Sequence, residues 1–180
     1  VVLVAPATAN VIAKMAHGQA DDMLTTVTLA AHCPKLVAPA MNTHMLENSI
    51  TQDNIRTLEH YGFTVIPSGS GLLACGDVGS GRLPEESVLV DYVLRELACE
   101  KDLTGKKVVV SAGATQEPMD PVRYLTNHST GKMGYAVARA CMLRGAEVVL
   151  LSSTSCTQPD VPFVKKVPFT TAKDLFEAVK

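Results

Sequence analysis

The sequence predicts an α/β protein of two consecutive domains, each built on a parallel, doubly wound sheet and each truncated. Short runs rich in β-branched residues alternate with helical patterns along the chain. Most of these runs end at a proline or a glycine, as buried parallel strands commonly do. A polar stretch then interrupts the alternation, which starts again after it. We therefore expect domains at 1–98 and 107–180, joined by a linker at 99–106.

The first domain is expected to hold three strands and four helices. The strands are expected at 1–5, 35–38 and 63–67. The helices are expected at 11–17, at 23–32, after residue 45 as far as about Tyr61, and at 85–94. Asp21 and Asp22 are placed to cap the second helix. The carboxyl ends of parallel strands meet at one edge, which is where open α/β sheets bind ligands.

Residues 68–85, called the flap here, hold Cys75 among several glycines. Because each glycine increases the backbone entropy that is lost on folding, we expect the flap to be neither helix nor strand. It is interpreted as a mobile segment that closes over a ligand and brings Cys75 with it. The alternative is a plain surface loop with an incidental thiol.

The second domain is expected to begin with a strand at 108–113 that runs into a glycine turn. A long irregular loop at 114–130 follows, and loops of this length are usually functional or disordered. A helix from Gly131 to Arg144 and a strand at 147–151 complete a βαβ unit, expected to be right-handed. The chain begins inside an expected strand and stops inside an expected helix, so we expect an internal piece of a longer protein.

Composition excludes several classes of function. A net charge of -2 without any basic run argues against nucleic-acid binding. No apolar run approaches the roughly 18 residues that a membrane-spanning helix needs, so no membrane contact is expected. The five cysteines are scattered and form no C-x-x-C pair, which favours a reducing cytoplasm over a disulfide framework or a zinc site. No residue is predicted to ligate a metal.

Polar side chains occur in the loops that follow the first two strands. Asn10 and Asn42 offer donors and acceptors that suit a carbonyl, a carboxylate or a flavin edge, although each could instead only cap a helix. Asp21 could bind a ligand hydroxyl or could cap its helix. Cys75 could act as a general acid, because a thiol with a pKa of roughly 8.5 is a competent proton donor at neutral pH.

These motifs carry a resemblance to a known family. Segments 6–10, 39–45 and 74–83 resemble the flavin-dependent phosphopantothenoylcysteine decarboxylases. Segments 111–115 and 120–134 resemble phosphopantothenate–cysteine ligase. The same order across a linker is similar to the bifunctional coenzyme A biosynthesis family, and the resemblance covers essentially the whole chain. It implies two Rossmann-like domains, the first decarboxylase-like and the second ligase-like.

For the first half, the resemblance implies FMN-dependent decarboxylation of 4'-phosphopantothenoylcysteine to 4'-phosphopantetheine. Cys75 matches the family's acid and Asn42 the residue that binds the substrate carboxylate. The residues implied to bind the cofactor are Thr8, Asn10, Asp21 and Met41, and those implied to bind the substrate are Gly76 and Arg82. The family's catalytic histidine precedes Val1, so the chain alone is expected to be inactive and to bind FMN weakly or not at all.

For the second half, the resemblance implies CTP-dependent and Mg²⁺-dependent ligation of 4'-phosphopantothenate with cysteine. Asn127 matches a residue linked to turnover of the acyl intermediate. The residues implied to bind substrate or nucleotide are Gly113, Arg123, Ser129, Gly131, Lys132 and Met133. Glycines at a helix N-terminus permit close backbone approach to phosphate, and an arginine can fork onto a phosphate or carboxylate.

The resemblance also implies assembly and location. The flavin halves are expected to form trimers, the ligase halves dimers, and the protein to be cytoplasmic with small-molecule substrates as its partners. Two other hypotheses for the function remain open. One is a non-catalytic regulatory subunit built on the flavin fold. The other is a Rossmann-type dehydrogenase, which the lack of a G-x-G-x-x-G motif after a strand disfavours.

Overall fold

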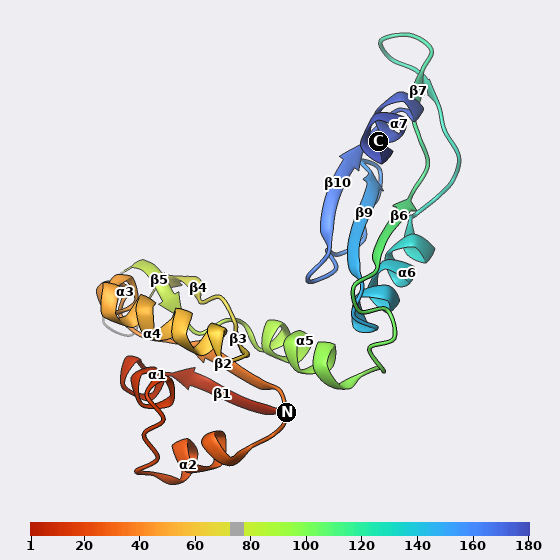
Figure 1. Ribbon diagram of the computed structural model, residues 1–180. Helices are drawn as coiled ribbons and strands as arrows, with labels where there is room; N and C mark the ends of the chain where they lie inside the picture. Colours follow the sequence, from red (N-terminus) through yellow and green to blue (C-terminus); the bar gives the residue numbers. More distant parts are fainter. Residues whose placement is uncertain (73–77) are drawn as a thin grey trace. The chain divides into compact units, whose positions relative to one another are not determined.

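A computed structural model describes residues 1–72 and 78–180 (Figure 1). The chain divides into two compact units, Val1–Leu97 and Ala98–Lys180. Each unit contains a three-stranded parallel sheet, so the predicted α/β class with parallel sheets is confirmed. Cys75 and Gly76 lie outside the described residues.

The first unit is built on the sheet β1-β2-β3, formed by β1 (Val2–Ala7), β2 (Lys35–Pro39) and β3 (Phe63–Val65). Successive side chains of a strand point to opposite faces. Val37 therefore packs with Ile12 and Leu58 on one face, whereas Leu36 and Ala38 pack on the other. The sheet is buried on both faces, which explains why its strands read as continuous apolar runs.

The described residues of this unit form the helices α1 (Ala9–Ala16), α2 (Met23–Ala30), α3 (Thr43–Glu47), α4 (Ser49–His60) and α5 (Glu86–Leu97). Helices α1 and α4 cover the Val37 face, and side chains of α5 pack on the Leu36 face. Asp22 caps α2 as predicted, because its carboxylate accepts a hydrogen bond from the Thr25 amide at 2.8 Å.

Several element boundaries in this unit were predicted wrongly; for example, β3 was expected to end at residue 67 and ends at Val65. Strand β1 continues through Pro6 to Ala7 with a shift in register, and the loop expected at 6–10 is therefore mostly strand and helix. The helix expected up to Tyr61 is interrupted at Asn48. The side chain of Asn48 accepts a hydrogen bond from the Ile50 amide at 3.0 Å, which starts a new helix.

The expectation that the flap contains no strand was also wrong. Strands β4 (Gly69–Leu72) and β5 (Val78–Arg82) form an antiparallel pair, and Figure 1 shows β5 beside α3. Entropy disfavours glycine in a strand, but here the absence of side chains permits close contact with the turn after β2, as described below.

The second unit has the sheet β10-β9-β6, from β6 (Lys107–Ala112), β9 (Glu147–Ser153) and β10 (Lys165–Phe169). Helix α6 (Lys132–Leu143) connects β6 to β9 and packs on both strands, as the expected βαβ unit requires. Helix α7 (Ala172–Val179) packs against β10.

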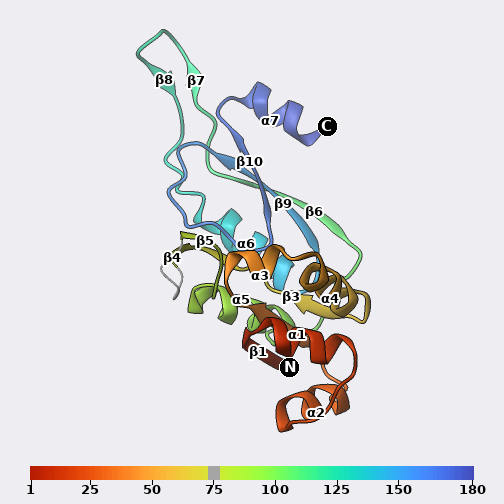
Figure 2. The ribbon, with the colours of Figure 1, turned by 90° about the vertical axis from the view of Figure 1, so that its left-hand side faces the viewer.

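The loop expected at 114–130 contains a short antiparallel pair, β7 (Glu117–Pro118) and β8 (Tyr124–Leu125). This hairpin projects beyond the end of the β6-β9-β10 sheet (Figure 2). Part of the stretch expected as a linker is bonded to the end of α6: the Leu103 amide donates to the Arg144 carbonyl at 3.0 Å, and the Lys101 amine donates to the Leu143 carbonyl at 2.7 Å.

Candidate functional site

The candidate site of the first unit lies at the carboxyl edge of its sheet. The Ala40 amide, just after β2, donates to the Ala7 carbonyl at 3.0 Å, so the first two strand ends are held together. The next residues, Met41 and Asn42, form the turn into α3. Thr8 leaves β1 at the same edge and caps α1. The first two strand-end segments singled out from the sequence therefore meet at one edge of the sheet.

Thr8 and Asn10 both lie at the start of α1 and are exposed. The Thr8 hydroxyl accepts a hydrogen bond from the Val11 amide at 3.3 Å. Asn10 is the second residue of the helix and does not cap it, which corrects the alternative that the sequence left open. Both side chains belong to a helix N-terminus, the end at which backbone amides and the helix dipole favour anions.

Asn42 caps α3, because its Oδ1 atom accepts a hydrogen bond from the His44 amide at 2.9 Å. The side chain is half-buried. The cap fixes the Oδ1 end of the amide, and the other end carries N–H donors of the kind that a carboxylate accepts. The capping and the binding interpretations of Asn42 therefore concern different atoms of its amide group.

The β4–β5 hairpin is fastened to this turn. The Thr43 hydroxyl donates to the Ser80 carbonyl at 2.7 Å, and the Met41 amide donates to the Gly81 carbonyl at 3.0 Å. Arg82, at the end of β5, is exposed and lies 3.2 Å from the Glu85 carboxylate. The structure thus brings Met41, Asn42 and Arg82 to the same hairpin and turn.

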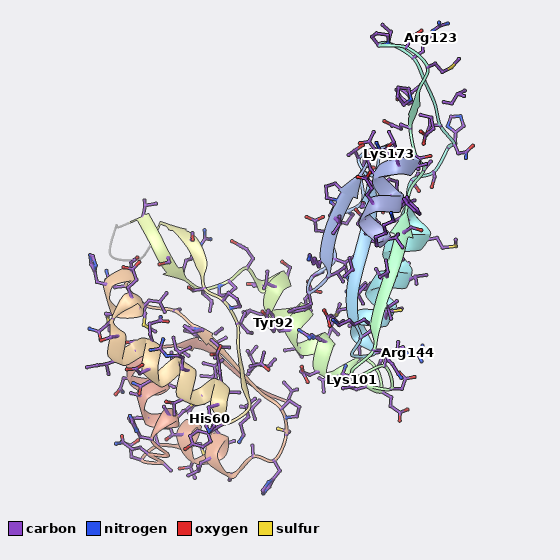
Figure 3. All side chains as sticks on the ribbon, turned by 45° about the horizontal axis from the view of Figure 1, so that its top comes forward. His60, Tyr92, Lys101, Arg123, Arg144 and Lys173 are labelled. Carbon is purple, nitrogen blue, oxygen red and sulfur yellow. The ribbon has the colours of Figure 1, made fainter. Side chains whose placement is uncertain are left out.

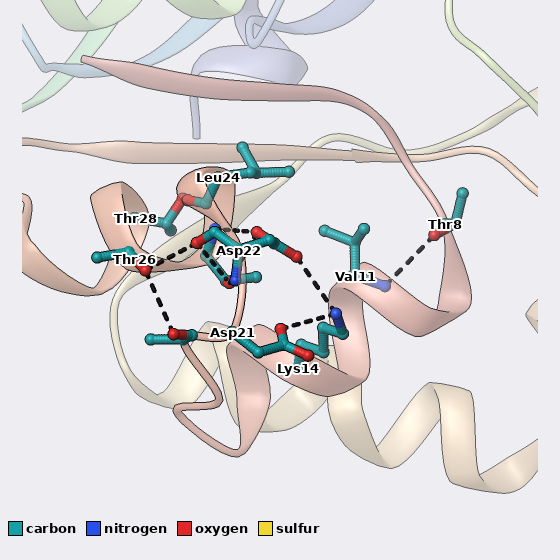
Figure 4. A network of polar contacts seen from close by, with 10 residues as sticks. Thr8, Val11, Lys14, Asp21, Asp22, Leu24, Thr26 and Thr28 are labelled. Atoms are coloured by element: carbon teal, nitrogen blue, oxygen red, sulfur yellow. Dashed lines mark hydrogen bonds and ion pairs between the residues drawn. The ribbon is translucent and has the colours of Figure 1, made fainter.

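Asp21 does not join these residues. Its carboxylate accepts a hydrogen bond from the Lys14 amine at 2.7 Å, and Lys14 lies in the last turn of α1 (Figure 4). The helix is about 12 Å long at 1.5 Å per residue, and Thr8 is at its other end. Hydrogen bonding to Asp21, and then to Asp22, raises the pKa of Lys14. Asp21 also does not cap α2, because the N-cap residue of that helix is Asp22.

A cavity of about 560 Å³ lies at the opposite edge of the same sheet, where β2 and β3 begin. Its lining includes Thr25 and Thr28 of α2 together with Lys35, Tyr61 and Phe63. The Lys35 amine lies 5.1 Å from the centre of the Phe63 ring. Sequence reasoning missed this cavity, because no local pattern relates the end of α1 to the starts of two strands.

In the second unit, a cavity of about 700 Å³ lies where β6 ends and α6 begins. It brings together most of the residues implied to bind a nucleotide: Gly113, Ser129, Gly131, Lys132 and Met133. His128 and Thr130 also line it and were not predicted. Gly113 and Gly131 have backbone φ angles of +88° and +72°, and residues other than glycine rarely adopt positive values of this kind.

A thiol explains why both glycines are required. A Cβ atom added to Gly113 or to Gly131 would lie 2.5 Å from the Sγ atom of Cys156. Cys156 is half-buried, and its thiol donates to the Ala112 carbonyl at 3.6 Å. No local pattern in the sequence predicts this role of Cys156, because the contact joins segments that are far apart along the chain.

Arg123 and Asn127 are both exposed and do not line this cavity. Arg123 lies at the tip of the β7–β8 hairpin (Figure 3), where its side chain pairs with Asp120 at 2.6 Å. Hydrogen bonds from the Val122 and Arg123 amides, and then from the Arg123 side chain, lower the pKa of Asp120. Arg123 therefore lies apart from the glycine turn, whereas Asn127 directly precedes His128, which lines the cavity.

Among residues 1–72 and 78–180, no group of three or more acidic, histidine or cysteine side chains is placed to hold a metal ion. Within the same described part of the chain, none of the helices combines the length and apolar character that crossing a membrane requires.

Comparisons with known proteins agree with the two units. Residues 1–98 match the family described as Flavoprotein, and residues 103–180 match the DNA/pantothenate metabolism flavoprotein C-terminal domain. The chain is 47% identical over 180 residues to the coenzyme A biosynthesis bifunctional protein CoaBC of Bacillus subtilis and 43% identical over 178 residues to that of Escherichia coli K12. Each match covers 99% of this chain and 44% of the relative, so the chain spans less than half the length of these relatives.

A solved structure is also similar to the chain. A mutant PPC decarboxylase complexed with pantothenoylaminoethenethiol matches 51% of this chain and 51% of its own, at 39% identity and a TM-score of 0.50. The family match covers the carboxyl-edge site described above. The chain therefore belongs to the flavoprotein family, with bifunctional coenzyme A biosynthesis proteins as relatives along nearly its whole length.

Proposed function

We propose that the first unit serves FMN-dependent decarboxylation of 4'-phosphopantothenoylcysteine in coenzyme A biosynthesis. The observation that carries the proposal is that a glycine hairpin is fastened to the Asn42 turn at the carboxyl edge of the sheet. Ligands of open α/β sheets bind at this edge. The family match over 1–98 and the similar PPC decarboxylase support the same assignment.

The residues at this edge fit a flavin. Thr8, Asn10 and Asn42 supply hydroxyl and amide groups that both donate and accept, which suits the mixed polar edge of the ring. Met41, the residue before Asn42, has an apolar side chain that packs against the core on the Val37 face of the sheet. Asp21 is hydrogen-bonded to Lys14 at the far end of α1, and we no longer include it in this set.

When bound, FMN would supply reversible two-electron chemistry, because it would accept two electrons from the substrate thiol and return them after decarboxylation, so that the reaction is redox-neutral overall. Loss of CO2 between these two transfers is easy because the oxidised sulfur group withdraws electrons. The N–H end of the Asn42 amide would bind the substrate carboxylate while Oδ1 stays on the His44 amide. Arg82 is exposed at the hairpin base and would attract an anionic substrate. Cys75, with Gly76 beside it, would donate the proton that completes the reaction.

The test compares two asparagines in the intact natural protein. Asn42 and Asn48 cap consecutive helices with similar bonds, of 2.9 Å and 3.0 Å. Both Asn42→Ala and Asn48→Ala should lower the melting temperature slightly, since each removes a cap. Only Asn42→Ala should raise the KM for 4'-phosphopantothenoylcysteine, by about tenfold or more if a charged hydrogen bond is lost.

Equal kinetic effects of the two substitutions would show that Asn42 acts only as a cap. Wild-type protein that binds FMN without any turnover would favour the non-catalytic regulatory alternative. Protein that neither binds FMN nor releases CO2 would overturn the proposed function.

For the second unit we propose CTP-dependent, Mg²⁺-assisted ligation of 4'-phosphopantothenate with cysteine. The cavity at the α6 N-terminus supports this, because its glycines leave backbone open to phosphate. In the intact protein, Lys132→Ala should raise the KM for CTP several-fold, since one charge-assisted contact is lost. Lys165 is an exposed residue of β10, and Lys165→Ala is the matched control that should leave the KM for CTP unchanged.

We retain two domains, and the family matches over 1–98 and 103–180 support a division within the predicted junction 99–106, with the second match starting at 103 rather than at 107. Assembly through trimers of the flavin domain and dimers of the ligase domain, in the cytoplasm, completes the proposal. Size-exclusion chromatography with light scattering on the intact protein tests the assembly directly. A monomer at micromolar concentration would contradict it.

A further inference from the structure

The turn after β2 and strand β5 form a close contact, which we call the seam. The seam consists of Met41, Thr43, Gly79, Ser80 and Gly81. Its two hydrogen bonds run from the Thr43 hydroxyl to the Ser80 carbonyl and from the Met41 amide to the Gly81 carbonyl, at 2.7 and 3.0 Å. The residues of the first pair are 37 positions apart in the sequence, so the seam is a tertiary contact.

The seam leaves no room for side chains on β5. A Cβ atom at Gly79 would lie 2.4 Å from the Thr43 Oγ1 atom. A Cβ atom at Gly81 would lie 2.2 Å from the Met41 carbonyl oxygen, and Gly81 also has a φ of +111°. The same hairpin offers a contrast at Gly69, where the nearest atoms would be backbone oxygens at 3.6 and 3.7 Å.

Asn42 lies between the two residues of the turn that bind β5. Its neighbours Met41 and Thr43 each give one hydrogen bond to the hairpin, and its own side chain binds the His44 amide. The backbone of Asn42 is therefore held on both sides. A shift of the hairpin would move the amide group that the proposed function assigns to the substrate carboxylate.

We propose that Thr43 is a positioning residue, whose hydroxyl locks the Asn42 turn to β5 and thereby sets the affinity for the substrate carboxylate. This inference rests on the proposed decarboxylase function. Thr43 does not itself touch substrate in this scheme; it acts through Asn42. A hydrogen bond of this kind contributes about two- to tenfold in an equilibrium constant.

The first experiment uses the intact protein with Thr43→Val and Thr43→Ser. Valine has the shape of threonine without the hydroxyl, so it should raise the KM for 4'-phosphopantothenoylcysteine about two- to tenfold and leave kcat and FMN binding unchanged. Serine keeps the hydroxyl and should restore a KM near that of the wild type. A purely structural role of Thr43 would change kcat, KM and FMN binding together.

The second experiment tests the packing of the seam. Gly79→Ala should raise KM, and Thr43→Ala in the same molecule should relieve the clash, because the nearest remaining Thr43 atom would be Cβ at 3.4 Å. The effects of the two substitutions should therefore be non-additive. Gly81→Ala meets backbone and should not be rescued by Thr43→Ala, and Gly69→Ala should leave the kinetics unchanged.

Amide hydrogen exchange tests the hydrogen bonding of the seam independently of the proposed decarboxylase function. In Thr43→Val the Met41 amide should exchange faster than in the wild type, whether or not the protein has decarboxylase activity. A wild type without turnover overturns the proposed function, and with it the role in substrate binding. If turnover is present, unchanged exchange or an unchanged KM in Thr43→Val would each overturn the inference. Additive effects of Gly79→Ala and Thr43→Ala would also do so.

Discussion

A single methyl group at Gly131 should destabilise the second unit through two effects that the structure allows to be separated. Gly131 caps α6 with a φ of +72°, and a Cβ atom there would lie 2.5 Å from the Cys156 Sγ atom. The left-handed backbone alone costs a non-glycine residue about 1–2 kcal/mol. Overpacking typically adds about 1–3 kcal/mol. We therefore expect Gly131→Ala to lower the free energy of unfolding by about 2–5 kcal/mol.

Gly105 provides the matched control. It lies in the same unit with a φ of +75°, and a Cβ atom there would have nothing within 4 Å. Gly105→Ala should therefore show only the backbone effect, of about 1–2 kcal/mol. Because 1 kcal/mol corresponds to about 4–8 °C in a domain of this size, the two variants should differ by roughly 5–20 °C in melting temperature.

Circular dichroism melts of the intact protein measure this difference. Repeating Gly131→Ala in a Cys156→Ala background should remove the overpacking and leave an effect close to that of Gly105→Ala. Equal melting temperatures for Gly131→Ala and Gly105→Ala, or no rescue by Cys156→Ala, would refute the packing argument. CTP titration of the same proteins should show weakened binding only for Gly131→Ala, since Gly105 lies outside the cavity.

Three further predictions concern stability. Leu58→Ala should lower the free energy of unfolding by about 2–5 kcal/mol in urea titrations, whereas Ile50→Ala, at a site 70% exposed, should change it little. Tyr135→Phe removes the buried hydrogen bond of 2.8 Å to the Ser152 hydroxyl and should lower the free energy of unfolding by about 1–3 kcal/mol. An unchanged midpoint in the urea titration would show that this hydrogen bond does not stabilise the protein. Hydrogen bonds from the Thr25 amide, and then from its side chain, lower the pKa of the Asp22 carboxyl in the folded protein. Asp22 therefore contributes fully to folding stability above its unfolded pKa, and this contribution is lost as the pH falls through the lower folded pKa. Asp22→Ala should therefore flatten the loss of melting temperature in acid below about pH 4.

Much of the fold could be predicted from local patterns. Strand β2 reads as an apolar run stopped by Pro39, and the structure gives it the same start and nearly the same end. The Asp22 cap is equally local, because a carboxylate one residue before a helix reaches amides within its own turn. The parallel sheets followed from strands separated by helices. The positions of the two strand-end segments at one edge followed from the topology.

Other features depend on contacts between distant segments and carry no local signal. The entropy cost of ordering glycine disfavoured strands in the flap, yet Gly79 and Gly81 lie in β5, where Thr43 and Met41 occupy the space that side chains would need. The resemblance implied that Asp21 binds the flavin, but pairing with Lys14 holds it at the other end of α1 from Thr8.

The sequence alone therefore determined most of the helices and most strands of the two parallel sheets, because hydrophobic periodicity and capping act within a few residues. The residues proposed for the two candidate sites came mainly from the family resemblance. Only the tertiary structure decided which backbone segments touch. The seam at Asn42 and the Cys156 contact with Gly113 and Gly131 are both decided by close packing. A packed interior leaves no room for even one added methyl group, and that constraint exists only once segments distant in sequence have come together.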